Sequence, residues 1–237
     1  MTTPVCAVIG VGPGNGAALA RRFAREGYAV ALLARSATTT EPLAHELAAA
    51  GATARVYACD AGDHASVVAA LTAVERDLGP IDALVYNAGT GAFGVLEAVD
   101  ASAFESALRV NATGLFVAAK HVAVGMVARG RGSIIAIGAT ASRRGVPRTI
   151  AFAPAKAAQR SLCEALARHL WPRGVHVALV IVDGVVDLPR TRKMMADKPD
   201  EFFIQPDDVA DAAFRTTTQP RSTWSFEVEA RPFGESW

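Results

Sequence analysis

The first residues with a pattern suited to binding a charged ligand form a glycine-rich run, Gly10-Val11-Gly12-Pro13-Gly14-Asn15-Gly16. The run follows a short apolar stretch at residues 5–9 and precedes an alanine-rich segment with helical spacing. Glycines in this position permit a tight turn, let the backbone approach a pyrophosphate, and leave its charge facing the N–H groups of a helix N-terminus. The run therefore predicts a dinucleotide site at Gly10, Gly14, Asn15 and Gly16.

The end of the second apolar stretch indicates which dinucleotide is bound. It reads Ala34-Arg35-Ser36 and contains no carboxylate. A carboxylate there would accept hydrogen bonds from a ribose 2′-hydroxyl, whereas an arginine suits a 2′-phosphate. Arg35, with Ser36 beside it, therefore favours NADP(H), the alternative being an ordinary surface arginine. Asp60, which closes the third stretch, could accept from the adenine amino group, cap the following helix, or do both.

These residues need a scaffold in which strands and helices alternate. Short apolar runs, many of them β-branched, occur at residues 5–9, 30–34, 54–58, 83–87, 133–139, 176–182 and 224–228, with helical segments between them. The helices at about residues 16–26 and from about Glu41 each stop at a glycine, Gly27 or Gly51. The pattern predicts a single Rossmann-type, doubly wound α/β domain over residues 1–237, in three layers with a parallel sheet. The stretch 187–206 contains prolines and no sheet pattern, and is either a lid or a surface excursion.

Composition narrows the class of ligand and the compartment. A net charge of +1, from 24 basic and 23 acidic residues, creates no field that would attract nucleic acid or anionic lipid. The first residues lack the pattern expected of a leader peptide, and no run approaches the ~20 apolar residues of a membrane span. The cysteines, Cys6, Cys59 and Cys163, stand far apart in apolar stretches, so we expect buried free thiols and no metal site. We therefore expect a cytoplasmic protein that binds a small molecule and neither nucleic acid nor membrane.

Four matches together make the sequence similar to the short-chain dehydrogenase/reductase family over nearly its whole length. The family's TGxxxGxG pattern appears as IGVGPGNG, with Ile9 where threonine is usual, and its NNAG segment as Tyr86-Asn87-Ala88-Gly89. Asn111 stands in RVNATG, and Lys156 ends a segment that aligns with YxxxK. The resemblance implies a seven-stranded parallel sheet with helices on both faces, cofactor contacts from Asn87, Ala88 and Gly89, and a homodimer or homotetramer. It also implies that Lys156 binds the nicotinamide ribose and that Asn111 anchors a water in a proton path.

The sequence departs from this family at the two residues that handle the substrate oxygen. YxxxK reads Phe152-Ala153-Pro154-Ala155-Lys156, and the serine expected thirteen residues before the tyrosine is Ala139. Phenylalanine has no ionisable proton and alanine has no hydroxyl, so neither can serve as an acid or hold an oxyanion. We expect ordinary ketone reduction to be very weak.

Substitute proton donors can be named from their positions near these two residues. Thr140 and Ser142 follow Ala139, where each either meets substrate or solvates a turn. Asp183 stands where the family has the proline of a PG pair, and either acts as an acid or holds a loop. The family's usual nearby threonine reads Leu188.

The sequence thus predicts an NADP(H)-binding oxidoreductase with an incomplete catalytic tetrad and an apolar small-molecule substrate. Two alternatives remain at this point. One is a reductase of activated carbon–carbon double bonds, of the enoyl type. The other is a dinucleotide-binding sensor or regulator that does not turn over.

Overall fold

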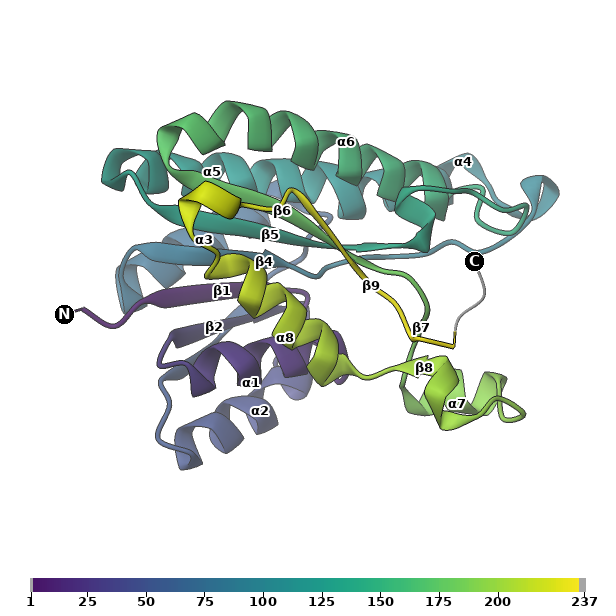
Figure 1. Ribbon diagram of the computed structural model, residues 1–237, viewed down its shortest axis with the longest axis horizontal. Coiled ribbons are helices and arrows are strands. Elements are labelled where there is room, and N and C mark those ends of the chain that lie inside the picture. The colour runs from purple at the N-terminus through teal and green to yellow at the C-terminus, as the bar shows by residue number, and fades with distance from the viewer. Residues whose placement is uncertain (1, 235–237) are drawn as a thin grey trace.

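A computed structural model describes residues 2–234, which contain a seven-stranded parallel sheet in the order β3-β2-β1-β4-β5-β6-β9 (Figure 1). The strands are β1 (Val5–Ile9), β2 (Ala29–Ala34), β3 (Ala54–Ala58), β4 (Ile81–Tyr86), β5 (Gly132–Ala139), β6 (Val175–Val182) and β9 (Glu227–Ala230). The chain winds outward from β1 in both directions, so the order reverses between β1 and β4. In such sheets ligands bind at the carboxyl ends of the strands beside this reversal. The predicted Rossmann-type, doubly wound fold is confirmed.

Helices cover both faces of the sheet and complete three layers (Figure 1). Helices α1 (Asn15–Arg25), α2 (Ala37–Ala49) and α8 (Pro206–Thr217) pack on one face; α3 (His64–Leu78), α5 (Gly114–Arg129) and α6 (Phe152–Leu170) pack on the other. The central strands are largely apolar on both sides, as buried parallel strands must be. In β1, Ile9 faces the α3 layer while Cys6 and Val8 face the α1 layer. The cysteines are buried free thiols, as predicted.

Two predicted boundaries are wrong by three or four residues. The last strand begins at Glu227 instead of residue 224, because the Trp224 ring stacks on His176 at 4.7 Å and holds this part of the chain out of the sheet. Helix α2 begins at Ala37 instead of Glu41, since Ser36 caps it by accepting a hydrogen bond from Thr38 N at 3.3 Å. The sequence did not predict this first turn because its threonines have low helix propensity.

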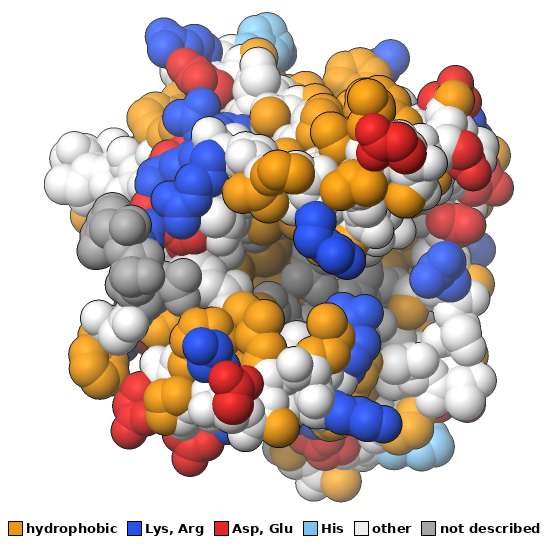
Figure 2. Space-filling model, turned by 90° about the vertical axis from the view of Figure 1, so that its right-hand side faces the viewer, with side chains coloured by type: hydrophobic (Ala, Val, Ile, Leu, Met, Phe, Trp, Pro, Cys, Tyr) orange, Lys and Arg blue, Asp and Glu red, His pale blue; other side chains and the backbone are white. Residues whose placement is uncertain are grey.

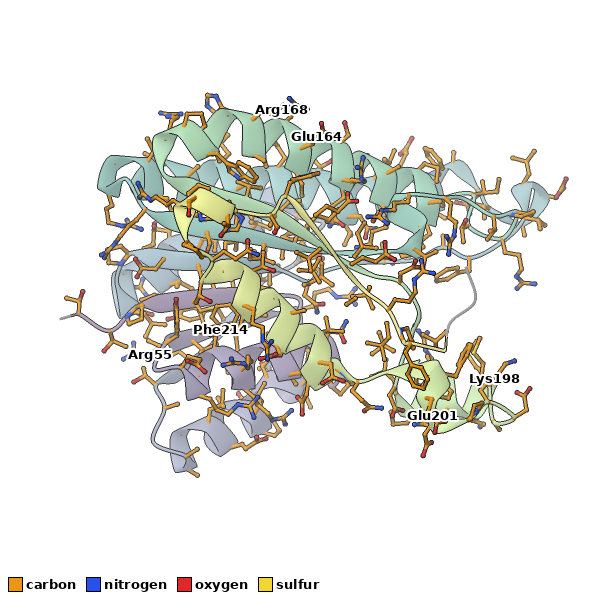
Figure 3. All side chains as sticks on the ribbon, viewed as in Figure 1. Arg55, Glu164, Arg168, Lys198, Glu201 and Phe214 are labelled. Carbon is orange, nitrogen blue, oxygen red and sulfur yellow. The ribbon has the colours of Figure 1, made fainter. Side chains whose placement is uncertain are left out.

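The stretch 187–206 contains more structure than the sequence pattern predicted. It holds α7 (Pro189–Met194) and β8 (Phe203–Ile204), which pairs in parallel with β7 (Val185–Val186) in a separate two-stranded sheet. The expectation of no sheet pattern is therefore wrong at its end, because a two-residue strand is too short to show a period. Lys198 and Glu201, labelled in Figure 3, lie on the part of this stretch that stands apart from the large sheet. Its action as a lid stays a prediction.

The helical stretch from Ala101 to Arg129 is apolar and long enough to cross a bilayer by length and composition alone. It consists of α4 (Ala101–Leu108), a π-helical turn (Arg109–Thr113) and α5. Its buried residues, including Leu115 and Met126, pack against the sheet in the same core as α3 and α6. This stretch therefore has the packing of a core helix.

Candidate functional site

A cavity of about 380 Å³ opens at the carboxyl ends of β1, β2, β3 and β4, beside the reversal of strand order. Its walls come from the turns after these strands and include Gly10, Gly12, Arg35, Asp60, Asn87 and Gly89. This edge of the sheet faces the viewer in Figure 2, where the surface is hollowed and Lys and Arg side chains lie around the hollow. The volume lies within the usual range for small-molecule sites. The structure thus brings predicted dinucleotide residues from four separate loops into one cavity.

The glycine-rich turn lies so close to neighbouring backbone that side chains cannot fit there. Gly10 has a φ of +91°, and a Cβ on it would lie 2.4 Å from Ala88 N. A Cβ on Gly16 would lie 2.6 Å from Gly10 O. Asn87 Nδ2 donates to the same Gly10 O at 2.7 Å and ties the turn to the end of β4. These contacts hold the N-terminus of α1 against the cavity.

The residues present fit a bound pyrophosphate. Helix α1 has no acidic residue in its first turn, so its positive end is not neutralised there. Asn15 Oδ1 is buried and has no hydrogen-bond partner within residues 2–234. A Cβ on Gly14 would lie 2.6 Å from Leu188 Cδ2, so the start of the 187–206 stretch packs directly on the turn.

Arg35 and Asp60 line this cavity on the turns after β2 and β3. Arg35 is exposed, and within the described chain no carboxylate forms an ion pair with it. Asp60 Oδ1 accepts a hydrogen bond from Gly62 N at 2.8 Å. The expectation that Asp60 caps the next helix is wrong: Asp63 caps α3, because the chain makes a two-residue turn after Asp60 before the helix starts.

Lys156 lies in a buried polar chain beneath Gly89. Its Nζ donates to Ile137 O at 2.9 Å and to Gln159 Oε1 at 3.0 Å. Gln159 Nε2 in turn donates to Asn111 O at 3.0 Å. Burial lowers the pKa of Lys156 to about 8, because the interior disfavours its charge. Sequence reasoning missed Gln159; its only signal was a glutamine three residues after Lys156, on the same helical face.

Asn111 is placed by the π-helical turn and is fully buried. Its Nδ2 donates to Thr90 O at 2.8 Å and to Ala107 O at 2.9 Å, while Oδ1 is buried without a hydrogen-bond partner in the described part of the chain. A Cβ on Gly89 would lie 3.1 Å from Asn111 Oδ1 and 3.7 Å from Lys156 Nζ. Both polar groups therefore lie directly behind Gly89, a cavity residue that has no side chain.

Phe152 and Ala139 lie near Lys156, and both are half-buried. The Phe152 ring centre is 6.0 Å from Lys156 Nζ and 5.0 Å from the ring centre of Phe93, which is 60% exposed. Ala139 is the last residue of β5, one strand away from the cavity's β4 edge. This part of the site therefore presents apolar surface and no ionisable hydroxyl from positions 139 and 152.

Ser142 and Thr140 are both engaged within the protein. Ser142 is buried and its Oγ accepts a hydrogen bond from Ala139 N at 3.1 Å. Thr140 Oγ1 donates to Asp183 Oδ1 at 2.5 Å. Thr140 would have to give up its bond to Asp183 to donate to a substrate, whereas Ser142 only accepts in its contact and keeps its own O–H, although its side chain is buried.

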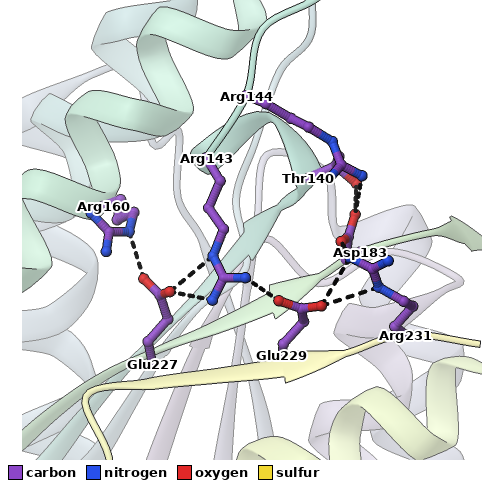
Figure 4. A network of polar contacts seen from close by, with 8 residues as sticks. All are labelled: Thr140, Arg143, Arg144, Arg160, Asp183, Glu227, Glu229 and Arg231. Atoms are coloured by element: carbon purple, nitrogen blue, oxygen red, sulfur yellow. Dashed lines mark hydrogen bonds and ion pairs between the residues drawn. The ribbon is translucent and has the colours of Figure 1, made fainter. Parts of the chain in front are cut away.

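Asp183 is buried and holds the segment just after β9 to the sheet (Figure 4). Its carboxylate forms an ion pair with Arg231, which follows β9, and approaches Arg144 at 3.5 Å. Arg231 also pairs with Glu229 at 3.0 Å. These contacts favour the loop interpretation of Asp183 over its use as an acid, because the carboxylate is already enclosed by two guanidinium groups and a hydroxyl.

Comparison with known proteins agrees with this architecture. A family model described as short chain dehydrogenase matches residues 4–199. The chain is 33% identical to 2-(S)-hydroxypropyl-CoM dehydrogenase 3 of Xanthobacter autotrophicus, over 88% of this chain and 87% of that protein. It is 32% identical to inactive 2-(S)-hydroxypropyl-CoM dehydrogenase 2 of the same organism, over 82% of this chain and 89% of that one.

Solved structures extend the similarity to the full length. A metagenomic short-chain oxidoreductase in complex with NADP superimposes with a TM-score of 0.85 at 31% identity, covering 98% of each chain. The matching family model spans the glycine turn, strands β1 to β6 and Lys156. The chain therefore belongs to the short-chain dehydrogenase family of oxidoreductases.

Proposed function

We propose that this chain is an NADP(H)-dependent oxidoreductase with an incomplete acid/base set, acting on an apolar small molecule. One observation carries the proposal: Lys156 lies behind the dinucleotide cavity, while the neighbouring positions 139 and 152 carry alanine and phenylalanine. The glycine turn, Arg35, Asp60, Asn87 and Lys156 would hold the cofactor. When bound, NADPH supplies a hydride. The complex of a solved relative with NADP supports this choice of cofactor.

The preference for the phosphorylated cofactor rests on Arg35, which is exposed at the cavity and forms an ion pair with no carboxylate among residues 2–234. We expect Arg35→Ala to weaken NADPH binding roughly ten- to a hundred-fold, because a charge-assisted hydrogen bond to phosphate is lost. NADH binding should hardly change. Fluorescence titration of both cofactors measures the effect.

Arg55→Ala is the matched control for this experiment. Arg55 is an exposed arginine on β3, and it lies away from the cavity at the other end of the sheet (Figure 3). Its removal changes the net charge equally and should leave both affinities as they were. Equal affinities for NADPH and NADH in the unaltered protein would contradict the assignment of NADP(H).

The substrate class follows from what the site lacks. A saturated ketone needs a proton at its oxygen as the carbon is reduced, and positions 139 and 152 cannot provide one. In an α,β-unsaturated carbonyl the negative charge spreads over an enolate, which backbone N–H groups can stabilise until water supplies the proton. The half-buried Phe152 ring and the exposed Phe93 ring offer apolar surface to such an acceptor. We therefore assign the chain to reduction of activated carbon–carbon double bonds.

A paired assay tests this choice of substrate. NADPH absorbance is followed with enones, enoyl thioesters and saturated ketones of matched size. We expect turnover with the unsaturated acceptors and very little with the ketones, because only the ketones require a local acid. A preference for ketones would reject the assignment.

A second candidate function is a dinucleotide-binding sensor without turnover. It is favoured by the enclosed hydroxyls of Ser142 and Thr140 and by the relative whose name describes it as inactive. Tight NADPH binding together with no oxidation of NADPH by any acceptor would select the sensor.

A further inference from the structure

Gln159 is a fully buried side chain that the proposed chemistry does not use. It lies on α6, one turn after Lys156, and faces the π-helical turn that carries Asn111. Burial of an amide is costly unless its donors and acceptor are satisfied. Gln159 therefore needs a reason for standing where an apolar side chain would pack at lower cost.

We propose that Gln159 is a positioning residue that holds the Lys156 ammonium toward the cofactor cavity and keeps it protonated there. The cofactor side of this inference rests on the proposed NADP(H) binding; the effect on Lys156 itself does not.

The hydrogen bonds around Lys156 leave one direction for a ligand. An ammonium group has three N–H donors and no acceptor. Two are taken, by Ile137 O and by Gln159 Oε1. The third is available on the side of Gly89, where a Cβ would lie 3.7 Å from Nζ and where the cavity begins. The amide thus restricts rotation of the ammonium and selects the N–H that faces the cavity.

Gln159 is itself held in one orientation. Its Nε2 donates to Asn111 O at 3.0 Å, which obliges Oε1 to face Lys156. A backbone carbonyl can only accept, so the reverse orientation of the amide would lose this bond and place Nε2 against the ammonium. The π-helical turn, Gln159 and Lys156 therefore form one connected unit from Asn111 to the cavity.

The charge of Lys156 depends on neutral groups. Among the described residues, the titratable side chain that acts on it is Cys163, on the same helix, and burial raises the pKa of that thiol to about 12, which keeps it neutral at physiological pH. The contacts from β5, the π-helical turn and the segment after β4 are carbonyl oxygens, an amide and a glycine. The ammonium is thus held by two oxygen acceptors and by no carboxylate. Loss of one acceptor should therefore lower the pKa of Lys156 clearly.

The test measures Lys156 directly, without cofactor. The chain has four lysines, and the other three, Lys120, Lys193 and Lys198, are exposed. Lysine labelled with ¹³C at Cε therefore gives one buried signal, which Lys156→Met identifies. NMR titration of this signal should show a pKa near 8 in the unaltered protein.

Two substitutions of similar shape should move this pKa in opposite directions. Gln159→Met keeps the length of the side chain but removes the acceptor, and should lower the pKa by about one to two pH units, the size of a hydrogen bond to a charged group. Gln159→Glu keeps the shape and adds a negative charge, and should raise the pKa above that of the unaltered protein. Glu164→Gln, an exposed change on the same helix, is the control and should leave it unchanged. Equal pKa values in all four proteins would overturn the proposal.

A second measurement tests the direction toward the cavity. NADPH affinity should fall as pH rises through the pKa of Lys156, since a deprotonated amine loses its charge. The pH at which NADPH affinity falls should be lower in Gln159→Met and higher in Gln159→Glu, in agreement with the pKa values measured by NMR. If the pKa of Lys156 shifts in the NMR titration but the pH dependence of NADPH affinity does not, the inference that Lys156 faces the cofactor is overturned. Absence of NADPH binding by the unaltered protein at every pH would instead reject the proposed function.

Discussion

The double substitution Ala139→Ser with Phe152→Tyr should increase ketone reduction with NADPH by about 10² to 10⁴-fold, the contribution of one positioned proton donor. Lys156 Nζ lies 6.0 Å from the Phe152 ring centre, so its charge would favour ionisation of a phenol at that position. Both positions are half-buried, and the Phe152 ring lies against the exposed Phe93 ring, with 5.0 Å between ring centres. Two added hydroxyls should therefore fit with little strain.

The rate of reduction of simple ketones, followed by the decrease in NADPH absorbance, measures this gain. Each single substitution should give much less than the pair, because residues that act as a unit do not contribute independently. Adding Lys156→Met to the double variant should remove the gain. If the unaltered chain already reduces simple ketones at about 1 to 10³ per second, another residue is the acid and the incomplete catalytic set is disproved.

Asp183→Ala should reduce the free energy of unfolding by about 3 kcal/mol, because it removes a buried carboxylate that pairs with the Arg231 guanidinium. The side chains of Asp183 and Arg231 are only 5% and 9% exposed, and Glu229 at 3.0 Å can compensate in part. Urea unfolding measures the change. If Asp183 holds the loop, NADPH affinity per folded molecule should change less than about twofold.

Arg168→Ala provides the matched comparison. It breaks an ion pair with Glu164 whose side chains are 79% and 39% exposed, on the outer face of α6 (Figure 3). Exposed pairs contribute only about 0.2 to 1 kcal/mol, so this variant should be nearly as stable as the parent. Asp183→Ala with unchanged stability but lost turnover would show instead that Asp183 is an acid of the reaction.

Much of the scaffold was predictable because its signals are local. Strands β1 to β6 are short, largely apolar runs between turn residues, and both predicted terminators, Gly27 and Gly51, have φ values above +80°. The glycine turn was predictable for the same reason, since the need for Gly10 and Gly16 arises within a few residues of the chain. The position of Arg35 at the cavity was predictable because it directly follows β2.

Other features depend on segments that only the folded sheet brings together. The last strand could not be placed because its start depends on Trp224 stacking against His176, 48 positions earlier in the chain. The sequence left two interpretations of Asp183 open. The structure favours one of them because it places Arg231, 48 positions later in the chain, beside the Asp183 carboxylate.

The sequence by itself determined the Rossmann framework and the two absent hydroxyls, because periodicity, turn chemistry and residue identity are properties of short segments. The tertiary structure alone decided what surrounds Lys156. Its partner Ile137 is 19 residues away, and the amide of Gln159 reaches Asn111 across 48 residues. A buried polar side chain must find partners wherever the fold supplies them, so its contacts are decided by packing and not by its neighbours in the chain.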